Sequence, residues 1–332
     1  MITPKSAANA MITVTLDGMR ALLVVNPKAT ATTARVRDVL ARALGSDLKV
    51  DVAETQRRGH AIELGAQAAA EGLDLVVVLG GDGTVNEVVN GLLRPLDEST
   101  DEAATRAALP ALAVVPGGST NVFSRALDIP HDPVEATGHL LDALHEGRSR
   151  RIGLGRADER WFTFTAGIGL DADAVRRVEH VRAGGKNATP TRYAWAAIRQ
   201  FFRNTDRRHP ALTLEIPGHE PVEGLYLGIV CNTAPWTYFG DHPITVTPTA
   251  SFDTGLDLAA MRKLRTVSTL WAAASMLSRD GLRGRNVSTW ADLSEFTLRA
   301  DRPMHVEVDG DYLGEREGLH LRAVPAALRV IC

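Results

Sequence analysis

The first half of the chain alternates short apolar runs with segments whose apolar residues recur at helical spacing. The apolar runs have the length of strands and lie at residues 21–25, 48–53, 75–79 and 111–115. The helix-like segments follow them, at residues 35–44, 60–71, 85–93, 122–127 and 133–146. This alternation predicts an open parallel sheet with helices on its faces. Residues 92–109 are polar without clear periodicity, and we predict a connector there.

The pattern changes near residue 148. Short, often alternating apolar segments then follow one another, separated by Gly, Pro or Asp, which is typical of antiparallel strands. They lie at residues 161–166, 211–216, 224–231, 256–261, 295–298 and 304–308. Helical spacing returns at residues 172–181, 191–203 and 266–278. We therefore predict a loose leader over 1–20, an α/β domain over 21–148 and an antiparallel β-sandwich domain with added helices over 149–318.

One stretch joins a buried strand to a glycine-rich turn. The apolar run Leu75–Leu79 ends at Gly80–Thr84, which reads Gly-Gly-Asp-Gly-Thr, and a helix-like segment follows. Glycine lets the backbone approach a ligand, and a helix N-terminus offers free N–H groups and a positive dipole end. This turn favours a phosphate, bound by the N–H groups of Gly81, Gly83 and Thr84. Asp82 suits such a site when a cation is present, which indicates a metal-bound nucleotide. The alternative is a plain strand–helix turn capped by the aspartate.

The other predicted strands also end in polar residues. Asn26 follows the first strand, Thr55 follows the second, and a second glycine-rich loop, Pro116–Asn121, follows the fourth. The carboxyl ends of parallel strands share one edge of the sheet, where open α/β folds bind ligands. We expect the candidate ligand-binding residues to gather there: Asn26, Thr55, Gly80, Gly81, Asp82, Gly83, Thr84, Ser119, Thr120 and Asn121.

Composition and charge exclude several classes of protein. The chain of 332 residues is 45% hydrophobic and 23% charged, as in ordinary globular proteins, and its net charge of −3 argues against a nucleic-acid partner. Cys231 and Cys332 follow no metal-ligand spacing and suit a reducing compartment. No apolar run reaches membrane-spanning length, and the N-terminus lacks a signal-peptide pattern. We expect a cytoplasmic protein that meets the inner face of the membrane peripherally.

Several motifs resemble those of the diacylglycerol-kinase catalytic family, which includes bacterial soluble lipid kinases and the sphingosine kinases. The glycine loop with its helix start, Gly80–Val88, is similar to the family's nucleotide loop, and it contains Glu87. The second glycine loop continues as a family-like motif to Arg125. The remaining matches are Asn26-Pro27, Thr55 with Gly59–Ala61, Gly167–Ala172 and Val308–Asp311. The resemblance covers residues from about 22 to 315.

This resemblance implies ATP- and Mg²⁺-dependent phosphorylation of a lipid hydroxyl in a cleft between the two domains. It implies that residues 319–332 return to complete the first domain. Asp82 would organise Mg²⁺ on ATP through water, since Mg²⁺ sheds its hydration reluctantly. Asp311 would accept the proton of the hydroxyl, because such a poor nucleophile needs a base. Lys28 and Arg125 are candidates for the positive charge, with a plain surface position as the alternative for each.

The chain departs from the family pattern at Asp311 and at three further places. Val122 and Gly153 stand where many members carry Asp, and Phe164-Thr165 stands where an Asn is usual, so the network around the metal is thinner here or is rebuilt from other groups. Asp311 stands where many members carry Glu. Asp253 and Asp257 resemble a stretch that some relatives use for a structural Mg²⁺, but we favour a structural turn over a metal site.

Residues 176–208 form a basic stretch with interleaved aromatic residues. It holds nine basic and two acidic side chains, with Tyr193, Trp195, Phe201 and Phe202 among them. A helix of this composition suits docking on anionic phospholipid headgroups. A solvated basic face whose aromatic residues pack inward is the alternative.

The identity of the acceptor stays open at this point. Diacylglycerol is the default in the bacterial branch of the family, and a sphingoid base or ceramide is an alternative. A soluble small-molecule kinase, such as an NAD kinase, shares the Gly-Gly-Asp-Gly loop. A regulator that binds nucleotide without catalysis is a third hypothesis, and both monomer and homodimer are open.

Overall fold

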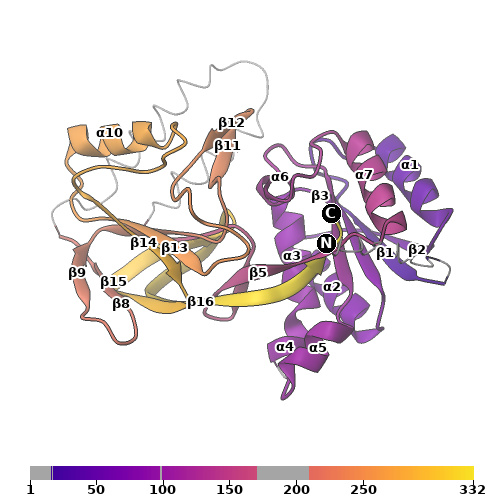
Figure 1. Cartoon of the computed structure of the whole chain (residues 1–332), viewed down its shortest axis with the longest axis horizontal. Coiled ribbons are helices and arrows are strands. Elements are labelled where there is room, and N and C mark those ends of the chain that lie inside the picture. The colour runs from indigo at the N-terminus through magenta and orange to yellow at the C-terminus, as the bar shows by residue number, and fades with distance from the viewer. Residues whose placement is uncertain (1–15, 17, 98, 170–208) are drawn as a thin grey trace, which may run out of the picture.

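The computed structural model describes residues 16, 18–97, 99–169 and 209–332. Figure 1 shows two domains side by side, an α/β domain and a domain built mostly of β-strands. Each domain has its own cluster of buried apolar side chains. The structure confirms the predicted fold class. The predicted helices at 172–181 and 191–203 and the basic stretch 176–208 lie outside the described residues.

The first domain is built on a four-stranded parallel sheet in the order β2-β1-β3-β4. Residues of β3 and β4 are buried throughout, because helices cover both faces of the sheet. The strands are β1 (Arg20–Val25), β2 (Lys49–Glu54), β3 (Leu75–Gly80) and β4 (Ala111–Pro116). The helices are α1 (Ala34–Gly45), α2 (His60–Ala70), α3 (Asp82–Leu92), α6 (Val122–Ala126) and α7 (Pro133–His145).

The connector predicted at 92–109 is wrong in one respect, because it contains two short helices. They are α4 (Arg94–Asp97) and α5 (Glu102–Ala108). Asp101 caps α5 by accepting the N–H of Ala104, and Arg106 forms an ion pair with Glu102 one turn away. Helix α5 has no buried residue, so it carries no apolar periodicity for the sequence to reveal.

The second domain is mainly antiparallel. Its strands are β5 (Arg150–Ala157), β6 (Arg160–Phe162), β7 (Thr165–Ile168), β8 (Leu212–Glu215), β9 (Val222–Leu225), β10 (Leu227–Cys231), β11 (Thr237–Phe239), β12 (His242–Ile244), β13 (Leu256–Met261), β14 (Val287–Leu293), β15 (Glu295–Val308) and β16 (Asp311–Val330). Helix α10 (Thr266–Ser275) lies across it. The apolar pattern did not reveal β5, β11, β12 or β14, and the two strands predicted within 295–308 are one strand with a register shift.

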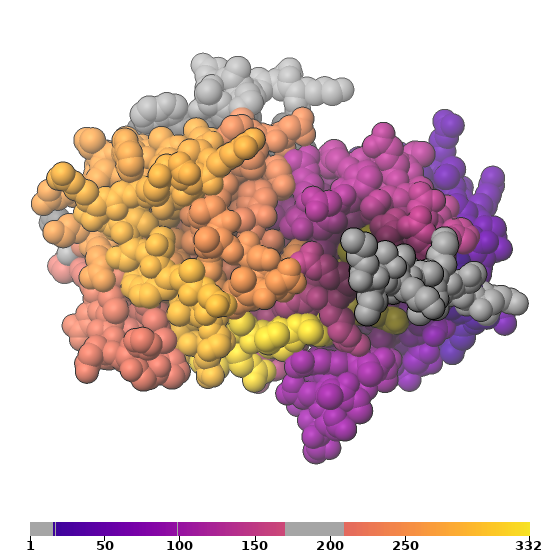
Figure 2. Space-filling model, in the orientation of Figure 1, coloured from indigo at the N-terminus to yellow at the C-terminus, as the bar shows by residue number. Residues whose placement is uncertain are grey.

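Strand β16 carries the chain from the second domain back to the first. It pairs with β15 along its first part and with β5 along its last part. Val330 reaches the parallel sheet, where it pairs with Leu112 of β4. Figure 2 shows β16 in yellow at the lower edge of the junction between the two lobes. Ile152 and Leu154 of β5 also belong to the apolar core of the first domain.

Candidate functional site

The two glycine-rich loops are in direct backbone contact. The N–H of Gly117 donates to the carbonyl of Gly80 at 2.8 Å. A Cβ atom on Gly118 would lie 2.8 Å from the Cα of Gly81, and one on Gly117 would lie 3.0 Å from the Cα of Gly80. These glycines are therefore required by the packing of one loop on the other. Gly83 differs, since a Cβ there would meet no atom within 4 Å.

Helix α3 begins directly at the first loop, and its N-terminal amides face the loop. Gly81 is the N-cap, and its carbonyl accepts the N–H groups of Thr84 and Val85. The prediction that the Thr84 N–H binds phosphate is therefore wrong, because the helix itself uses that donor. The amides of Asp82 and Gly83 lie in the first turn, where a helix offers N–H groups to an anion. The Thr84 hydroxyl accepts a hydrogen bond from Nδ2 of Asn26 at 2.9 Å.

Asp82 connects α3 to α6. Its two carboxylate oxygens accept the N–H groups of Val122 and Phe123 at 3.0 and 3.1 Å. The N-cap residue of α6, Asn121, makes no capping bond of its own with its side chain. Asp82 therefore supplies the negative charge that stabilises this helix N-terminus. Asn121 instead closes the second loop, where its side chain exchanges hydrogen bonds with the backbone of Gly118.

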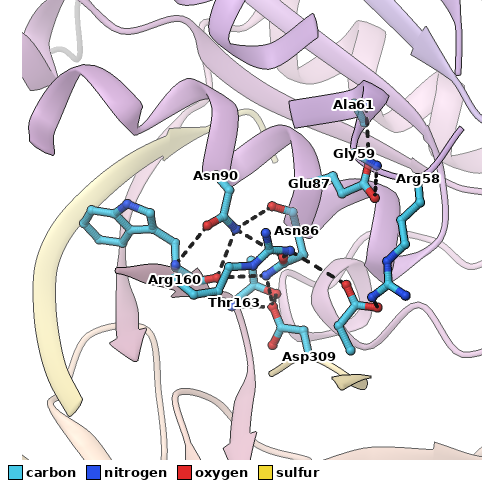
Figure 3. A network of polar contacts seen from close by, with 11 residues as sticks. Arg58, Gly59, Ala61, Asn86, Glu87, Asn90, Arg160, Thr163 and Asp309 are labelled. Atoms are coloured by element: carbon cyan, nitrogen blue, oxygen red, sulfur yellow. Dashed lines mark hydrogen bonds and ion pairs between the residues drawn. The ribbon is translucent and has the colours of Figure 1, made fainter. Parts of the chain in front are cut away.

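Glu87 plays the same part for α2. Its two oxygens accept the N–H groups of Gly59 and Ala61 at 2.9 and 3.2 Å, as Figure 3 shows. Gly59, the N-cap of α2, has no side chain with which to cap the helix. Gly65 and Gly91 let the two helices approach closely, since a Cβ on either would collide with the backbone of the other helix. The structure thus gives Glu87 a role in holding α2 in place.

The next turns of α3 bind the second domain. Asn86 donates from Nδ2 to Oδ2 of Asp309 at 2.7 Å and to the Trp161 carbonyl at 3.0 Å. Asn90 both donates to the Trp161 carbonyl and accepts the Trp161 N–H, at 3.0 Å each. Arg160 donates to Oδ1 of Asn86 at 2.5 Å. The sequence pointed to none of Asn90, Arg160 and Trp161, whereas Asn86 and Asp309 lie inside the family-like motifs Gly80–Val88 and Val308–Asp311.

Asp309 lies at the centre of this interdomain network. Besides Asn86 it accepts hydrogen bonds from the N–H and hydroxyl of Thr163 and from the N–H groups of Phe164 and Thr165. Burial raises the pKa of this carboxyl, while the hydrogen bonds from residues 163–165 oppose that shift. Asp309 and Gly310 both have positive φ and form the two-residue turn between β15 and β16. The aspartate of this turn therefore also joins the two domains.

Asp311 is the first residue of β16 and lies between two arginines. Arg58 contacts Oδ1 at 2.8 Å, and Arg160 lies 3.7 Å from Oδ2. Arg58 comes from the loop before α2, whereas Arg160 belongs to β6. The side chain of Asp311 is partly exposed. The hairpin turn and the two arginines together fix the carboxylate at the junction of the domains.

These elements surround one cavity of about 660 Å³. Ten of the predicted binding and catalytic residues line it: Asn26, Thr55, Gly81, Asp82, Gly83, Thr84, Glu87, Ser119, Thr120 and Asp311. Gly80 and Asn121 do not line it and act through the packing of the loops. The wall on the side of the second domain includes Phe164, Trp236 and Thr237. The structure thus brings together strand ends and a hairpin that lie far apart in the sequence.

Two models of known protein families match the chain, and together they cover most of it. The sequence model described as "Diacylglycerol kinase catalytic domain" matches residues 20–157. A second one, described as "YegS C-terminal NAD kinase beta sandwich-like domain", matches residues 165–332. The chain therefore belongs to the family that carries this second domain, which alone matches half of it, and its residues 20–157 belong to the diacylglycerol kinase catalytic-domain family.

Relatives in this family are similar over limited stretches. A diacylglycerol kinase of Bacillus subtilis (strain 168) is 39% identical over 111 residues, which are 33% of this chain and 32% of the relative. A diacylglycerol kinase of Staphylococcus saprophyticus is 30% identical over 125 residues, or 38% and 36% of the two chains. The chain thus aligns with about a third of the length of these curated relatives.

Solved structures support the shared fold. A crystal structure of a diacylglycerol kinase from Bacillus anthracis str. Sterne has a TM-score of 0.68 and 19% sequence identity, covering 94% of this chain and 96% of that one. A second structure from the same organism has a TM-score of 0.71 at 21% identity with the same coverage.

Two arginines that the sequence did not single out, Arg57 and Arg58, add positive charge to the cavity. Lys28, Arg57 and Arg58 line the cavity. Arg125 does not, because its guanidinium lies over the Tyr238 ring at 4.3 Å and contacts Asp241 at 3.3 Å. It therefore attaches the hairpin β11–β12 to the first domain. Burial raises the pKa of Tyr238.

The carboxylates fit a metal ion carried by a nucleotide better than a metal cage made by the protein. Among the described residues, no group of three or more His, Cys, Asp or Glu side chains could hold a metal. Mg²⁺ needs only one or two carboxylates when substrate phosphates and water complete its shell, and Asp82 at the glycine loop meets that demand. An aspartate cannot replace Gly153, since a Cβ there would lie 2.8 Å from the Phe252 carbonyl.

Asp253 and Asp257 are used by the structure in other ways. Asp253 forms an ion pair with Arg150 at 2.5 Å. Asp257 is buried and accepts hydrogen bonds from the Thr249 hydroxyl and the Asp292 N–H. These contacts agree with the structural turn that the sequence analysis favoured over a metal site.

Proposed function

We propose that this chain transfers the γ-phosphoryl group of ATP to the hydroxyl of a lipid, with diacylglycerol as the acceptor and phosphatidic acid as the product. The observation that carries the proposal is the shared cavity. The glycine loop at the start of α3 and Asp311 of the hairpin β15–β16 line the same space. A donor-phosphate site and a candidate base therefore face one another across the domain junction.

The first domain provides the phosphate end of the site. The α3 N-terminus supplies amide donors, Ser119 and Thr120 supply hydroxyl groups, and Lys28 and Arg57 supply positive charge. Phosphoryl transfer depends mainly on positioning and on neutralising charge, and these groups serve both needs. Mg²⁺ bound to ATP near Asp82 would neutralise further phosphate charge.

The second domain provides the acceptor end. Asp311 accepts the proton as the acceptor oxygen forms its bond to phosphorus, and the electron pair of the broken P–O bond passes to ADP. Arg58 and Arg160 hold the Asp311 carboxylate in place. Phe164 and Trp236 give this end an apolar wall, which suits the acyl part of a lipid.

A diacylglycerol acceptor lies in a bilayer, so the proposed reaction requires the protein to meet a membrane. Among the described residues, no helix is long and apolar enough to cross a membrane. We propose that the protein acts at the cytoplasmic face of the membrane and binds anionic phospholipid headgroups there, as the lipid acceptor requires.

An assay with several acceptors tests the proposal. Purified protein is incubated with labelled ATP and Mg²⁺ and with diacylglycerol, sphingosine, ceramide or NAD in turn. We expect label in phosphatidic acid and its loss when Mg²⁺ is chelated. Label on sphingosine or ceramide would keep the reaction class and change the acceptor. Label on NAD, or ATP binding without any product, would overturn the proposal in favour of a soluble small-molecule kinase or a regulator.

A further inference from the structure

Helix α10 presents an apolar face to solvent. Val267 and Trp271 of the helix are 82% and 60% exposed, and Leu277 in the turn that follows it is 55% exposed. Val267 and Trp271 are four residues apart, so they lie on the same side of the helix. Thr269 and Ala272 lie on the opposite side and are buried against the second domain. Exposed apolar groups gathered on one helix face mark an interaction site more often than isolated ones do.

Basic residues flank this apolar segment on both sides along the chain, and no charged residue lies within it. No charged residue occurs from Thr266 to Ser278. The flanking segments carry six exposed basic residues against one acidic residue, Asp280, in a chain whose net charge is −3. The basic residues are Arg262, Lys263, Arg265, Arg279, Arg283 and Arg285. An exposed apolar segment with exposed basic residues on both flanks complements a surface that is apolar inside and anionic at its boundary.

The hairpin β11–β12 connects this helix to the cavity. His242 of β12 contacts the Leu277 carbonyl at 3.1 Å, and the Thr245 N–H donates to the Met276 carbonyl at 2.8 Å. At its other end the hairpin begins with Thr237, which lines the cavity. The exposed Phe239 lies between the two. Figure 1 shows α10 and this hairpin next to each other along the upper edge of the second domain.

We infer that α10 and its basic flanks dock on a bilayer that contains anionic lipid. Val267, Trp271 and Leu277 enter the boundary between headgroups and acyl chains, where tryptophan is favoured, and the flanking arginines and lysine bind the lipid phosphates. The hairpin β11–β12 then lies between the bilayer and the cavity. Delivery of the acceptor along this route rests on the proposed lipid kinase function, whereas the docking itself does not.

Vesicle co-sedimentation of the full chain tests the docking surface. The vesicles are phosphatidylcholine alone or phosphatidylcholine with phosphatidylglycerol. We expect binding to the anionic vesicles, weakened by salt, and at least about tenfold weaker for Trp271→Ser with Val267→Ser and for Lys263→Glu with Arg265→Glu. Val134→Ser with Val39→Ser removes two exposed valines of the first domain and should leave binding unchanged. Unchanged binding of both α10 variants would overturn the inference.

A fluorescent label shows whether the helix face itself enters the bilayer. Val267→Cys is labelled with a polarity-sensitive dye in a Cys332→Ser background, since the remaining Cys231 is buried. The emission should shift to shorter wavelength on anionic vesicles, and a label at Val134→Cys should not shift. A label at position 267 that stays in water while the protein sediments would overturn the inference.

Two further measurements separate the docking from its alternatives. If α10 instead pairs two copies of the chain, light scattering shows a dimer that Trp271→Ser with Val267→Ser makes monomeric, while vesicle binding is unchanged; that result overturns the inference. If the wild type binds through α10 but phosphorylates no lipid, the docking stands and the proposed function fails. If lipid in vesicles is phosphorylated equally by the α10 variants, the proposed function stands and the docking is overturned.

Discussion

Asn86 of helix α3 donates a 2.7 Å hydrogen bond to Asp309 of the hairpin β15–β16, although the two residues are 223 positions apart. This contact joins the helix that starts at the glycine loop to the turn that places Asp311. Each end of the proposed reaction therefore depends on the other domain for its position. Helix α3 uses Asp82, Asn86, Glu87 and Asn90 to contact α6, the hairpin, α2 and β6 respectively.

Asp309→Asn should destabilise the whole protein. One oxygen that accepts hydrogen bonds becomes an NH₂ group that faces buried donors, and we expect a loss of about 2–4 kcal/mol in the free energy of unfolding. Urea unfolding followed by circular dichroism measures it. Asp241→Asn, at a fully exposed aspartate, is the control and should change stability by less than about 0.5 kcal/mol. Equal stabilities would contradict the central role of Asp309.

Asp311→Asn should remove most of the activity and leave the fold intact. The partly exposed carboxylate is held by Arg58 and Arg160, and its proposed task is to accept the proton of the acceptor. We expect kcat to fall about 10²- to 10⁴-fold while ATP binding stays within about threefold. Lipid kinase assays and nucleotide titration measure the two effects. Turnover near that of the wild type would exclude Asp311 as the base.

Asp82→Asn should separate the structural task of this residue from its catalytic one. The amide keeps one acceptor for the α6 N-terminus, so we expect a loss of stability of only about 1 kcal/mol, while loss of the charge lowers turnover at least about 100-fold. Asp132→Asn is a matched control, because Asp132 caps α7 with one oxygen and does not line the cavity. The control should lose similar stability and keep its turnover. A normal turnover in Asp82→Asn would refute the proposed role beside Mg²⁺.

Gly83→Ala should weaken ATP binding and Gly118→Ala should lower the stability of the fold. A Cβ on Gly83 projects into open space at the cavity, so stability is expected to stay within about 1 kcal/mol while affinity for ATP falls about tenfold. A Cβ on Gly118 collides with Gly81, and we expect a loss of about 1–3 kcal/mol in stability. Thermal unfolding and nucleotide titration distinguish the two. The reverse pattern would show that the glycine roles are assigned wrongly.

The two thiols should react very differently. Burial raises the pKa of Cys231 to about 12, so at pH 8 only about one in 10⁴ of these groups is a thiolate. Cys332 is only half-buried. Titration with a chromogenic disulfide at pH 8 should release one equivalent from the native protein and the second only in denaturant. Native Cys332→Ser should release none, and rapid release from that variant would contradict the burial of Cys231.

The sequence by itself determined the parallel α/β domain, the glycine loops and ten of the residues that line the cavity. Buried parallel strands are continuous apolar runs, and helices beside them carry a 3.6-residue period, so both patterns are local and readable. The shared edge of such a sheet then gathers Asn26, Thr55 and the two loops. The Asp309-Gly310 pair is also a local pattern. A two-residue hairpin turn requires positive φ at both residues, and Asp-Gly is one of the pairs that adopt it most readily.

Only the tertiary structure decided which polar groups those residues contact. Asp82 and Glu87 resembled ligand groups, yet their oxygens accept the amides of α6 and α2, because each of those helices lacks a capping side chain of its own. The network around Asp309 and the two arginines at Asp311 join residues that are distant in the sequence. A hydrogen bond depends on distance and direction in space, and those are set by how the two domains pack, which no local pattern records.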